Sequence, residues 1–318
     1  MSFVYIANID NLKISSTLSK GKKIGELRIT NSKDNLLKLI DVIQFNAMYG
    51  KLDFNYLGNS TYIYGNGKIE DITDKESSNI DFIKTVNILN RKSQFFTSLL
   101  WLIKDNSVHL ETGFLISEMN GRIEYTKNSF YHSFVNAYGM NEQVTFSSEE
   151  INEVSNYYQY FDNREINKSE ENINENPLGK KFKRFERAFY LLGYARSESN
   201  LALRIMLYCT VLESLFTSDN REISHKVGER FSLILGSNSE DKLKYYKLVK
   251  DAYTIRSKAV HGQTVNNKIE DLMGISKNID DAIREIFKGI IGGKDKYEVF
   301  HMQKNDDFEK YFTELIFS

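Results

Sequence analysis

The 318-residue chain has very little of the residues that support disulfide-stabilised or metal-dependent folds. It contains one cysteine, one proline and five histidines. A single cysteine excludes an internal disulfide and a cysteine-based metal cluster, so a cytoplasmic protein is expected. Cys209 lies in an apolar stretch and is expected to be a small buried hydrophobic residue.

The chain also lacks segments that would place it in a membrane or hold a nucleotide. Its densest apolar run, 95–103, is too short to cross a bilayer, and the N-terminus lacks the basic and apolar regions of a secretory signal. No segment has the Gly-x4-Gly-Lys-Ser/Thr pattern of a phosphate-binding loop, and the histidines show no metal-ligand spacing. We therefore expect no membrane association, no metal and no cofactor.

Charge is balanced overall but unevenly distributed. The net formal charge is −1, yet residues 1–177 carry 18 basic and 23 acidic side chains, whereas residues 178–318 carry 24 and 20. The second half is therefore mildly basic. This is compatible with phosphate contacts but falls short of a strong nucleic-acid footprint, and solvated helix faces explain it about as well.

Residues 1–161 carry mixed strand and helix signals and are expected to form an α+β domain. The pair Asn120-Gly121 predicts the turn of a hairpin, and the segment 65–67 predicts a second tight turn. The expected strands are 3–7, 25–30, 61–64 and the two arms of a hairpin over 109–125. The expected helices are one capped at 31–34 and reaching 43, one over 77–104, and one capped at 147–150 and reaching 160.

A polar segment follows this part. Residues 162–177 are charge-rich, nearly free of apolar side chains and end at the only proline, which predicts a linker or loop. From 178 to 318 the periodicity is mostly helical, so we expect an all-α bundle whose tail, 294–318, docks as a strand and a last helix. The expected helices are 178–196, 197–216, one capped by Asp219 and reaching 235, 239–261 and 276–290.

The last helical turns before Gly262 carry the most informative residues. Gly262 suits the left-handed position that follows a helix end. Tyr253, Ser257 and His261 follow one another at four-residue steps and therefore share a face. Arg256 flanks that row, about 140° and about 7.5 Å from His261 on a straight helix. One copy of this helix thus offers one base-capable group and one cation on diverging faces.

An arginine five residues before a histidine is weak evidence alone, since composition predicts roughly 0.2 chance matches in this chain. Its context is more specific. Leu-Glu-Ser-Leu-Phe at 212–216 precedes Gly-Glu-Arg-Phe at 228–231 and Tyr-x-x-Arg-Ser-Lys-x-Val-His-Gly at 253–262. These segments, in this order, resemble the Apea-like group of the HEPN superfamily over roughly residues 180–290. The family often has asparagine after the arginine, where this chain has Ser257.

The resemblance implies a HEPN-like bundle acting as a metal-independent endoribonuclease on single-stranded RNA loops, tRNA among them. Arg256 and His261 would be its catalytic residues, meeting their own copies in the composite cleft of a homodimer. The chemistry suits them, because histidine exchanges a proton near neutral pH and arginine binds phosphate bidentately. Apea-like proteins are associated with bacterial antiphage defence by abortive infection, which is the implied role.

Each candidate also has an ordinary structural interpretation. His261 at a helix end suits the helix dipole, and Arg256 is equally suited to pairing with a carboxylate. Glu213, in an otherwise apolar helix, needs a buried partner. That partner is Arg256 or His261 if Glu213 orients the site, and a local hydroxyl or Arg204 if it does not. The further supporting candidates, each equally compatible with a surface or packing role, are Tyr253 to stack on a base, Ser257 to fix His261, and Lys258 to hold a phosphate.

Two function classes therefore stay open: a HEPN-type endoribonuclease, and a non-catalytic RNA-binding or dimerisation module. Residues 1–161 are expected to recognise a phage-derived or cellular trigger, with the aromatic-rich stretch 114–138 as its binding surface. In this hypothesis the acidic first half restrains the basic second half until the trigger binds.

Overall fold

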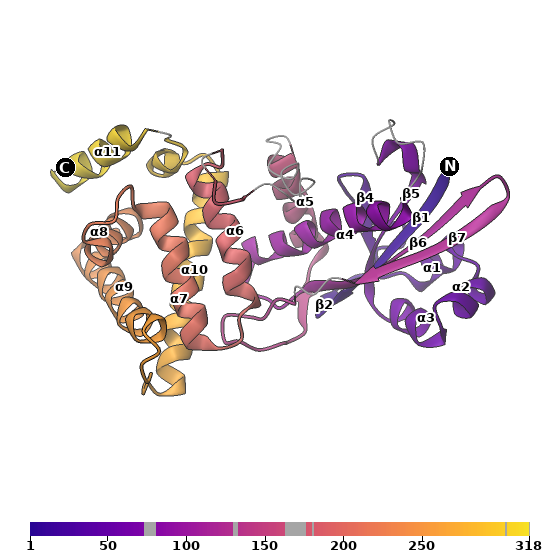
Figure 1. The fold of residues 1–318 in the computed structure, drawn as a ribbon, viewed down its shortest axis with the longest axis horizontal. Coiled ribbons are helices and arrows are strands. Elements are labelled where there is room, and N and C mark those ends of the chain that lie inside the picture. Colours follow the sequence, from indigo (N-terminus) through magenta and orange to yellow (C-terminus); the bar gives the residue numbers. More distant parts are fainter. Residues whose placement is uncertain (73–80, 130–132, 163–175, 180, 303, 318) are drawn as a thin grey trace. The chain divides into compact units, whose positions relative to one another are not determined.

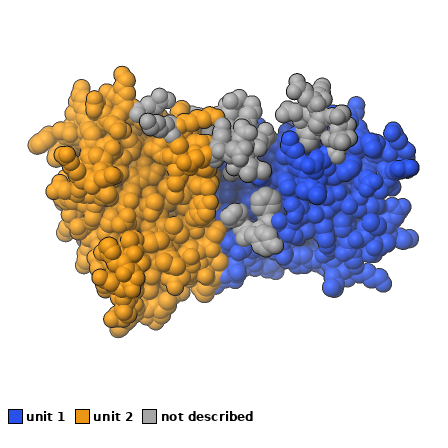
Figure 2. Space-filling view, in the orientation of Figure 1, with its two compact units in different colours: residues 1–134, 141–173 blue, residues 135–140, 174–318 orange. Residues whose placement is uncertain are grey.

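A computed structural model describes residues 1–72, 81–129, 133–162, 176–179, 181–302 and 304–317. The chain separates into two compact units, residues 1–134 with 141–173 and residues 135–140 with 174–318 (Figure 2). Most of the predicted linker, 162–177, lies outside the described residues. Within the described part, no helix is both long enough and apolar enough to span a membrane.

The first unit contains an antiparallel sheet accompanied by helices, as the α+β prediction requires. Six strands pair in the order β3-β4-β5-β1-β6-β7, and β2 and β8 form a short parallel pair. The strands are β1 (Ser2–Asp10), β2 (Leu12–Ile14), β3 (Lys22–Ile24), β4 (Leu27–Thr30), β5 (Thr61–Lys68), β6 (His109–Met119), β7 (Arg122–Ser129) and β8 (Val144–Phe146). The helices are α1 (Lys33–Leu39), α2 (Val42–Met48), α3 (Lys51–Gly58), α4 (Phe82–Leu99) and α5 (Ser148–Asp162), with 3-10 turns at Ile69–Asp71 and Leu100–Leu102.

Strand β1 is buried on both faces because helices cover both sides of the sheet (Figure 1). On one face the Tyr5 hydroxyl donates to Asn90 Oδ1 of α4 at 2.9 Å. On the other, Ile6 packs with Phe114 of β6 and Phe45 of α2 in one apolar cluster. Side chains alternate along a strand, so neighbouring residues of β1 serve the two helical layers in turn.

The two turns predicted in this unit have different outcomes. The β6–β7 hairpin confirms the turn at Asn120 and Gly121, which both have positive φ. The turn expected at 65–67 is wrong, because β5 continues through it and pairs with β1. At Gly65 a Cβ would lie 2.6 Å from Leu27 Cδ2 of β4, so this glycine marks a close approach inside the sheet.

The helix expected to run from the cap at 31–34 to residue 43 is two helices. Ser32 caps α1 by accepting from the Asn35 N–H at 3.3 Å, but α1 ends at Leu39. Asp41 then accepts hydrogen bonds from the N–H groups of Ile43 and Gln44. The carboxylate of Asp41 therefore starts a second helix where apolar spacing alone suggested continuation.

Two further predictions are tested only in part. The helix expected at 77–104 is α4, which begins at Phe82, and residues 77–80 lie outside the described part. In the stretch 114–138, Phe114 and Phe134 are buried, whereas Met119 and Ile123 are exposed. The described residues also leave out 130–132 of that stretch.

The second unit is helical, as predicted for residues 178–318. Its helix α10 begins seven residues earlier than expected, at Ile269, with two carboxylates in its first turn. Glu222, rather than Asp219, is the N-cap of α8, and a 3-10 turn replaces the strand expected after residue 294. The helices are α6 (Arg184–Ser197), α7 (Leu201–Phe216), α8 (Ile223–Leu235), α9 (Ser239–Val260), α10 (Ile269–Ile291) and α11 (Asn305–Phe317), with the 3-10 turn at Asp295–His301.

Helix α7 is the centre of this unit and contacts α6, α8, α9 and α10. Several of its polar side chains are buried or half-buried and are paired. Arg204 Nε donates to the Tyr208 hydroxyl at 2.9 Å, and that hydroxyl donates to Asp280 Oδ1 of α10 at 2.7 Å. Arg284 forms an ion pair with the same carboxylate. Because Arg204 is fully buried, its charge depends on such partners for compensation.

Residues 135–140 belong to the helical unit, whereas the sequence assigned them to the first domain. Arg204 Nη2 donates to the Val135 carbonyl at 3.1 Å, and Ser276 Oγ donates to the Ala137 carbonyl at 2.6 Å. The Val135 N–H in turn donates to the Arg196 carbonyl. Main-chain contacts to a distant segment leave no periodic signal in a sequence, which explains the difference.

We predict that Tyr208→Phe destabilises the helical unit by about 1–3 kcal/mol. The substitution removes the hydroxyl that joins Arg204 to Asp280, so each of these buried groups loses one hydrogen bond. Urea unfolding followed by circular dichroism measures the change. Tyr311→Phe is the matched control, because its hydroxyl makes only an exposed 3.2 Å bond to the Lys296 carbonyl. Equal stability of the two variants would contradict the prediction.

Candidate functional site

Helix α9 presents the predicted motif, and its C-terminal end is built around Gly262 as the sequence suggested. Asn238 caps the start by accepting from the Asp241 N–H at 2.9 Å. At the end, Gly262 has φ +63°, its N–H donates to the Ala259 carbonyl, and the Gln263 N–H donates to the Lys258 carbonyl at 2.8 Å. These two bonds form a Schellman motif, which holds the last turn of the helix in one conformation.

The buried face of α9 orients the motif toward α7. Val249, Ala252 and Ile255 are buried at three-residue intervals. This spacing places Tyr253 and Arg256, each one position further along, at the edge of the face that packs on α7. Both of these side chains are half-buried rather than solvent-exposed.

Glu213 of α7 holds Arg256 and Tyr253 together. Arg256 Nη2 lies 3.1 Å from Glu213 Oε1, and the Tyr253 hydroxyl donates to the same oxygen at 3.0 Å. The guanidinium carbon of Arg256 lies 5.7 Å from the centre of the Tyr253 ring, within the range of a cation–π contact. Of the two arginines that could pair with Glu213, Arg256 is therefore the one that does so, while Arg204 pairs elsewhere.

Burial and the nearby Glu213 carboxylate raise the pKa of the Tyr253 hydroxyl well above its ordinary value. The neutral hydroxyl donates a hydrogen bond to the carboxylate, so Tyr253 acts as a fixed donor.

Burial likewise raises the pKa of the Cys209 thiol. Cys209 is buried as predicted, and the buried thiol is a poor nucleophile at neutral pH.

A cavity of about 600 Å³ adjoins this group, and we call it the basic cavity. Three basic side chains, Lys250, Arg256 and Lys258, line it against one acidic side chain, Glu213. Lys250 Nζ lies 3.1 Å from Ser224 Oγ of α8. Cations around a concave surface with hydroxyl and amide donors suit an anion such as a phosphodiester.

Five of the six predicted site residues line the basic cavity, and one does not. Those that line it are Glu213, Tyr253, Arg256, Ser257 and Lys258. His261 is the C-cap residue of α9, is exposed to solvent and is not among the cavity's lining residues. Within one chain, the base-capable group is therefore not part of the wall of the cavity that holds the arginine.

Sequence reasoning missed several lining residues. Lys250 lies three and seven residues before Tyr253 and Ser257, on the same side of the helix, so counting along α9 could have found it. Ser224 and Ile223 come from α8, and no spacing rule connects them to α9. Their contribution depends on how the two helices pack.

The described residues contain no group of three or more His, Cys, Asp or Glu side chains arranged to hold a metal ion. The basic cavity is also poor in metal ligands, since Glu213 is its one carboxylate and is occupied by Arg256 and Tyr253.

Comparison with protein-family models, curated proteins and solved structures finds no significant match to this chain.

We predict that Glu213→Gln lowers the free energy of unfolding by about 1–3 kcal/mol, because it leaves the half-buried Arg256 without its carboxylate. Urea unfolding measures the change. Glu314→Gln is the matched control, because Glu314 pairs with Lys310 on an exposed helix surface where ion pairs contribute little. A Glu213→Gln protein as stable as this control would contradict the assignment of Glu213 as the anchor of the site.

We also predict that Tyr253→Phe flattens the loss of stability at alkaline pH. The folded-state pKa of Tyr253 is raised, so its contribution is present below the unfolded pKa of about 10 and is lost as pH rises above it. Removing one such group should reduce that loss by up to about 1.4 kcal/mol per pH unit. Urea unfolding of both proteins from about pH 8 to pH 11.5 tests this. Parallel curves would show that Tyr253 keeps an ordinary pKa in the fold.

Proposed function

We propose that the helical unit is a metal-independent endoribonuclease of HEPN type that cleaves single-stranded RNA. The observation that carries the proposal is the basic cavity, in which Glu213 and Tyr253 hold Arg256 beside Lys250 and Lys258. The three-segment resemblance supports the same activity. RNA loops, including those of tRNA, are the proposed substrates, and abortive defence against phage is the proposed role.

The proposed reaction needs a proton acceptor, a proton donor and a cation. The acceptor takes the proton of a ribose 2′-hydroxyl, whose oxygen then attacks the adjacent phosphorus. The bond from phosphorus to the 5′-oxygen breaks, and the donor protonates that oxygen. The products are a 2′,3′-cyclic phosphate and a 5′-hydroxyl. Arg256 stabilises the charge that develops on the phosphoryl oxygens.

In this proposal the supporting residues have distinct tasks. Glu213 and Tyr253 position Arg256, so Tyr253 holds the arginine instead of stacking on a base. Lys250 and Lys258 contact the phosphates that flank the scissile one, and Ser257 supplies a hydroxyl at the cavity wall. His261 is the proton-transfer group, and imidazole is the side chain suited to that task near neutral pH.

A second copy of the chain completes the proposed site. His261 is exposed and does not line the cavity of its own chain, so the cavity wall of a single chain contains no histidine beside the arginine. In a two-fold dimer with residues 253–262 near the axis, each copy's histidine would serve the cleft they share. The first unit would bind the phage-derived or cellular trigger that releases the activity.

We predict that His261→Ala and Arg256→Ala each reduce RNA cleavage by about 10²–10⁴-fold while the protein stays folded. Purified protein is incubated with a single-stranded RNA in excess EDTA, and the product ends are identified as cyclic phosphate and 5′-hydroxyl. Lys310→Ala, on the exposed surface of α11, is the control with a similar loss of charge. Unchanged cleavage by a folded His261→Ala protein would refute the assignment. RNA binding without cleavage by the wild type would favour the non-catalytic module.

Mixing the two inactive variants tests the shared cleft. A dimer formed from one Arg256→Ala chain and one His261→Ala chain contains one intact arginine and one intact histidine. If the cleft is shared, the remaining histidine can still accept the proton of the 2′-hydroxyl beside the intact arginine, so mixing after mild dissociation should restore a small but measurable fraction of wild-type activity. If both groups act within one chain, the mixture stays inactive. A protein that is monomeric by light scattering and cleaves at an unchanged specific rate on dilution would also contradict the dimer.

A further inference from the structure

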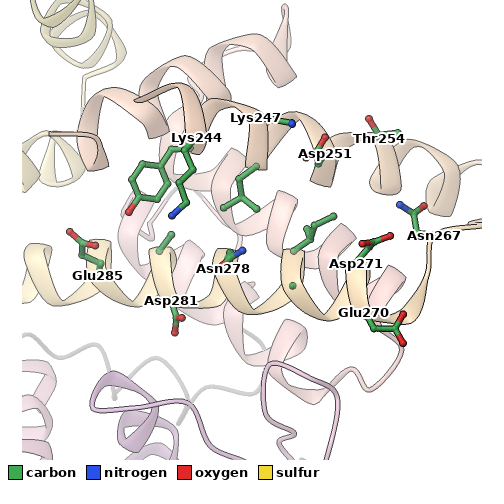
Figure 3. Close-up of a pocket in the computed structure, with 15 residues that line it drawn as sticks. Lys244, Lys247, Asp251, Thr254, Asn267, Glu270, Asp271, Asn278, Asp281 and Glu285 are labelled. Carbon is green, nitrogen blue, oxygen red and sulfur yellow. The ribbon is translucent and has the colours of Figure 1, made fainter. Parts of the chain in front are cut away.

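Helix α9 borders a second and larger hollow, between α9 and α10, of about 740 Å³ (Figure 3). We call it the acidic groove. It runs along residues 244–254 of α9 and 270–285 of α10, which correspond to about 15 Å and about 22 Å of helix. Among the candidate site residues it includes none, so the proposed ribonuclease does not account for it.

The floor of the acidic groove is apolar and partly open to solvent. Leu248 of α9 and Ile275 of α10 line it and are only half-buried, and Ala282 lies deeper. Gly274 lies on an exposed part of the α10 wall, and a Cβ there would meet no atom within 4 Å. An apolar strip beside a glycine lets another backbone approach closely.

The rim of the acidic groove carries an excess of negative charge. Its charged lining residues are five acids, Asp251, Glu270, Asp271, Asp281 and Glu285, and two bases, Lys244 and Lys247. Asp281 is already paired, with Lys277 and Arg284. The other four carboxylates are exposed and have no ion pair among the described residues. Three of these four lie at the end near Asn267, where Figure 3 shows Asp271 and Glu270 close to the start of α10.

The charge of this groove is opposite to that of the basic cavity, which also borders α9. Thr254 lines both hollows, so a surface with excess positive charge adjoins one with excess negative charge along this helix. A nucleic-acid strand is repelled by the acidic side. The occupant of the acidic groove must instead be apolar on one face and basic at its margins.

We propose that the acidic groove docks a basic amphipathic helix of a partner protein. A helix laid between two others presents apolar side chains at positions i, i+3, i+4 and i+7 to a groove floor, here Leu248, Ile275 and Ala282. Lysine or arginine on its flanks would pair with Asp251, Glu270, Asp271 and Glu285. This inference is independent of the ribonuclease activity, since none of the candidate site residues lines the groove.

A designed peptide serves as the probe. It has about 18 residues in an alanine background, leucine at the i, i+3, i+4 and i+7 positions and lysine on both flanks, with a matched peptide in which glutamate replaces every lysine. Binding to the full-length protein is followed by fluorescence anisotropy. The basic peptide should bind, the acidic one should not, and the affinity should fall as salt rises.

Substitutions in the acidic groove are expected to change the affinity for the basic peptide in opposite directions. Glu270→Gln with Asp271→Asn should weaken binding at least about tenfold, whereas Lys247→Gln should tighten it, because it removes a like charge from the rim. Gly274→Trp should block the groove by filling its open wall. Glu314→Gln, on α11, should leave the affinity unchanged. Circular dichroism checks that each variant is folded.

Three results would overturn the proposal. The first is equal binding of the acidic and basic peptides, and the second is an affinity that neither the carboxylate variants nor Gly274→Trp alters. The third is a wild-type dimer, seen by sedimentation velocity, that the Glu270→Gln, Asp271→Asn variant dissociates. That result would make a second copy of this chain the occupant of the groove.

Discussion

The helical unit depends on the pairing of a few polar side chains along α7, a helix that is otherwise apolar and surrounded by neighbours. A buried charge is tolerated only when a partner compensates the loss of water. Near the start of α7, Arg204 meets this requirement through Tyr208, Asp280 and the Val135 carbonyl. Near its end, Glu213 meets it through Arg256 and Tyr253. These two groups of contacts fix α10 and α9 against the central helix.

The second group of contacts has consequences beyond stability. By holding Arg256 half-buried, Glu213 lowers the conformational freedom of a side chain that is otherwise long and mobile. A positioned guanidinium binds a phosphate with a smaller loss of entropy than an exposed one. The same carboxylate also neutralises part of the positive charge of the cavity, so Lys250 and Lys258 supply its remaining excess. In the proposed site, stability and phosphate binding would therefore both depend on Glu213.

Helix α9 borders two hollows of opposite charge. Lys250, Arg256 and Lys258 line one of them, whereas Asp251 and carboxylates of α10 line the other. Such a division limits where a polyanion can lie, because a strand held on the basic side meets repulsion if it crosses the helix. It also leaves the other side available to a basic protein segment.

Much of the fold was predictable because it depends on local physics. The helical second half follows from its apolar periodicity, and the end of α9 follows from Gly262, the residue best suited to a left-handed position. The hairpin turn at Asn120 and Gly121 has the same kind of cause. Predictions failed where a local signal had two meanings. Gly65 predicts a turn but marks a close approach in a sheet, and Asp41 starts a helix where the apolar spacing predicts that one continues.

By itself, the sequence determined which residues could do chemistry and which helix carries them, because helical spacing sets the relation of Tyr253, Arg256, Ser257 and His261. Tertiary structure alone decided their surroundings. Glu213 is 43 positions from Arg256, and its choice of Arg256 over Arg204 follows from the packing of α7 on α9. The basic cavity, whose wall does not include His261, likewise forms only when helices pack. The same is true of the acidic groove between α9 and α10. Contacts between distant segments leave no period in a sequence, so only the folded chain reveals them.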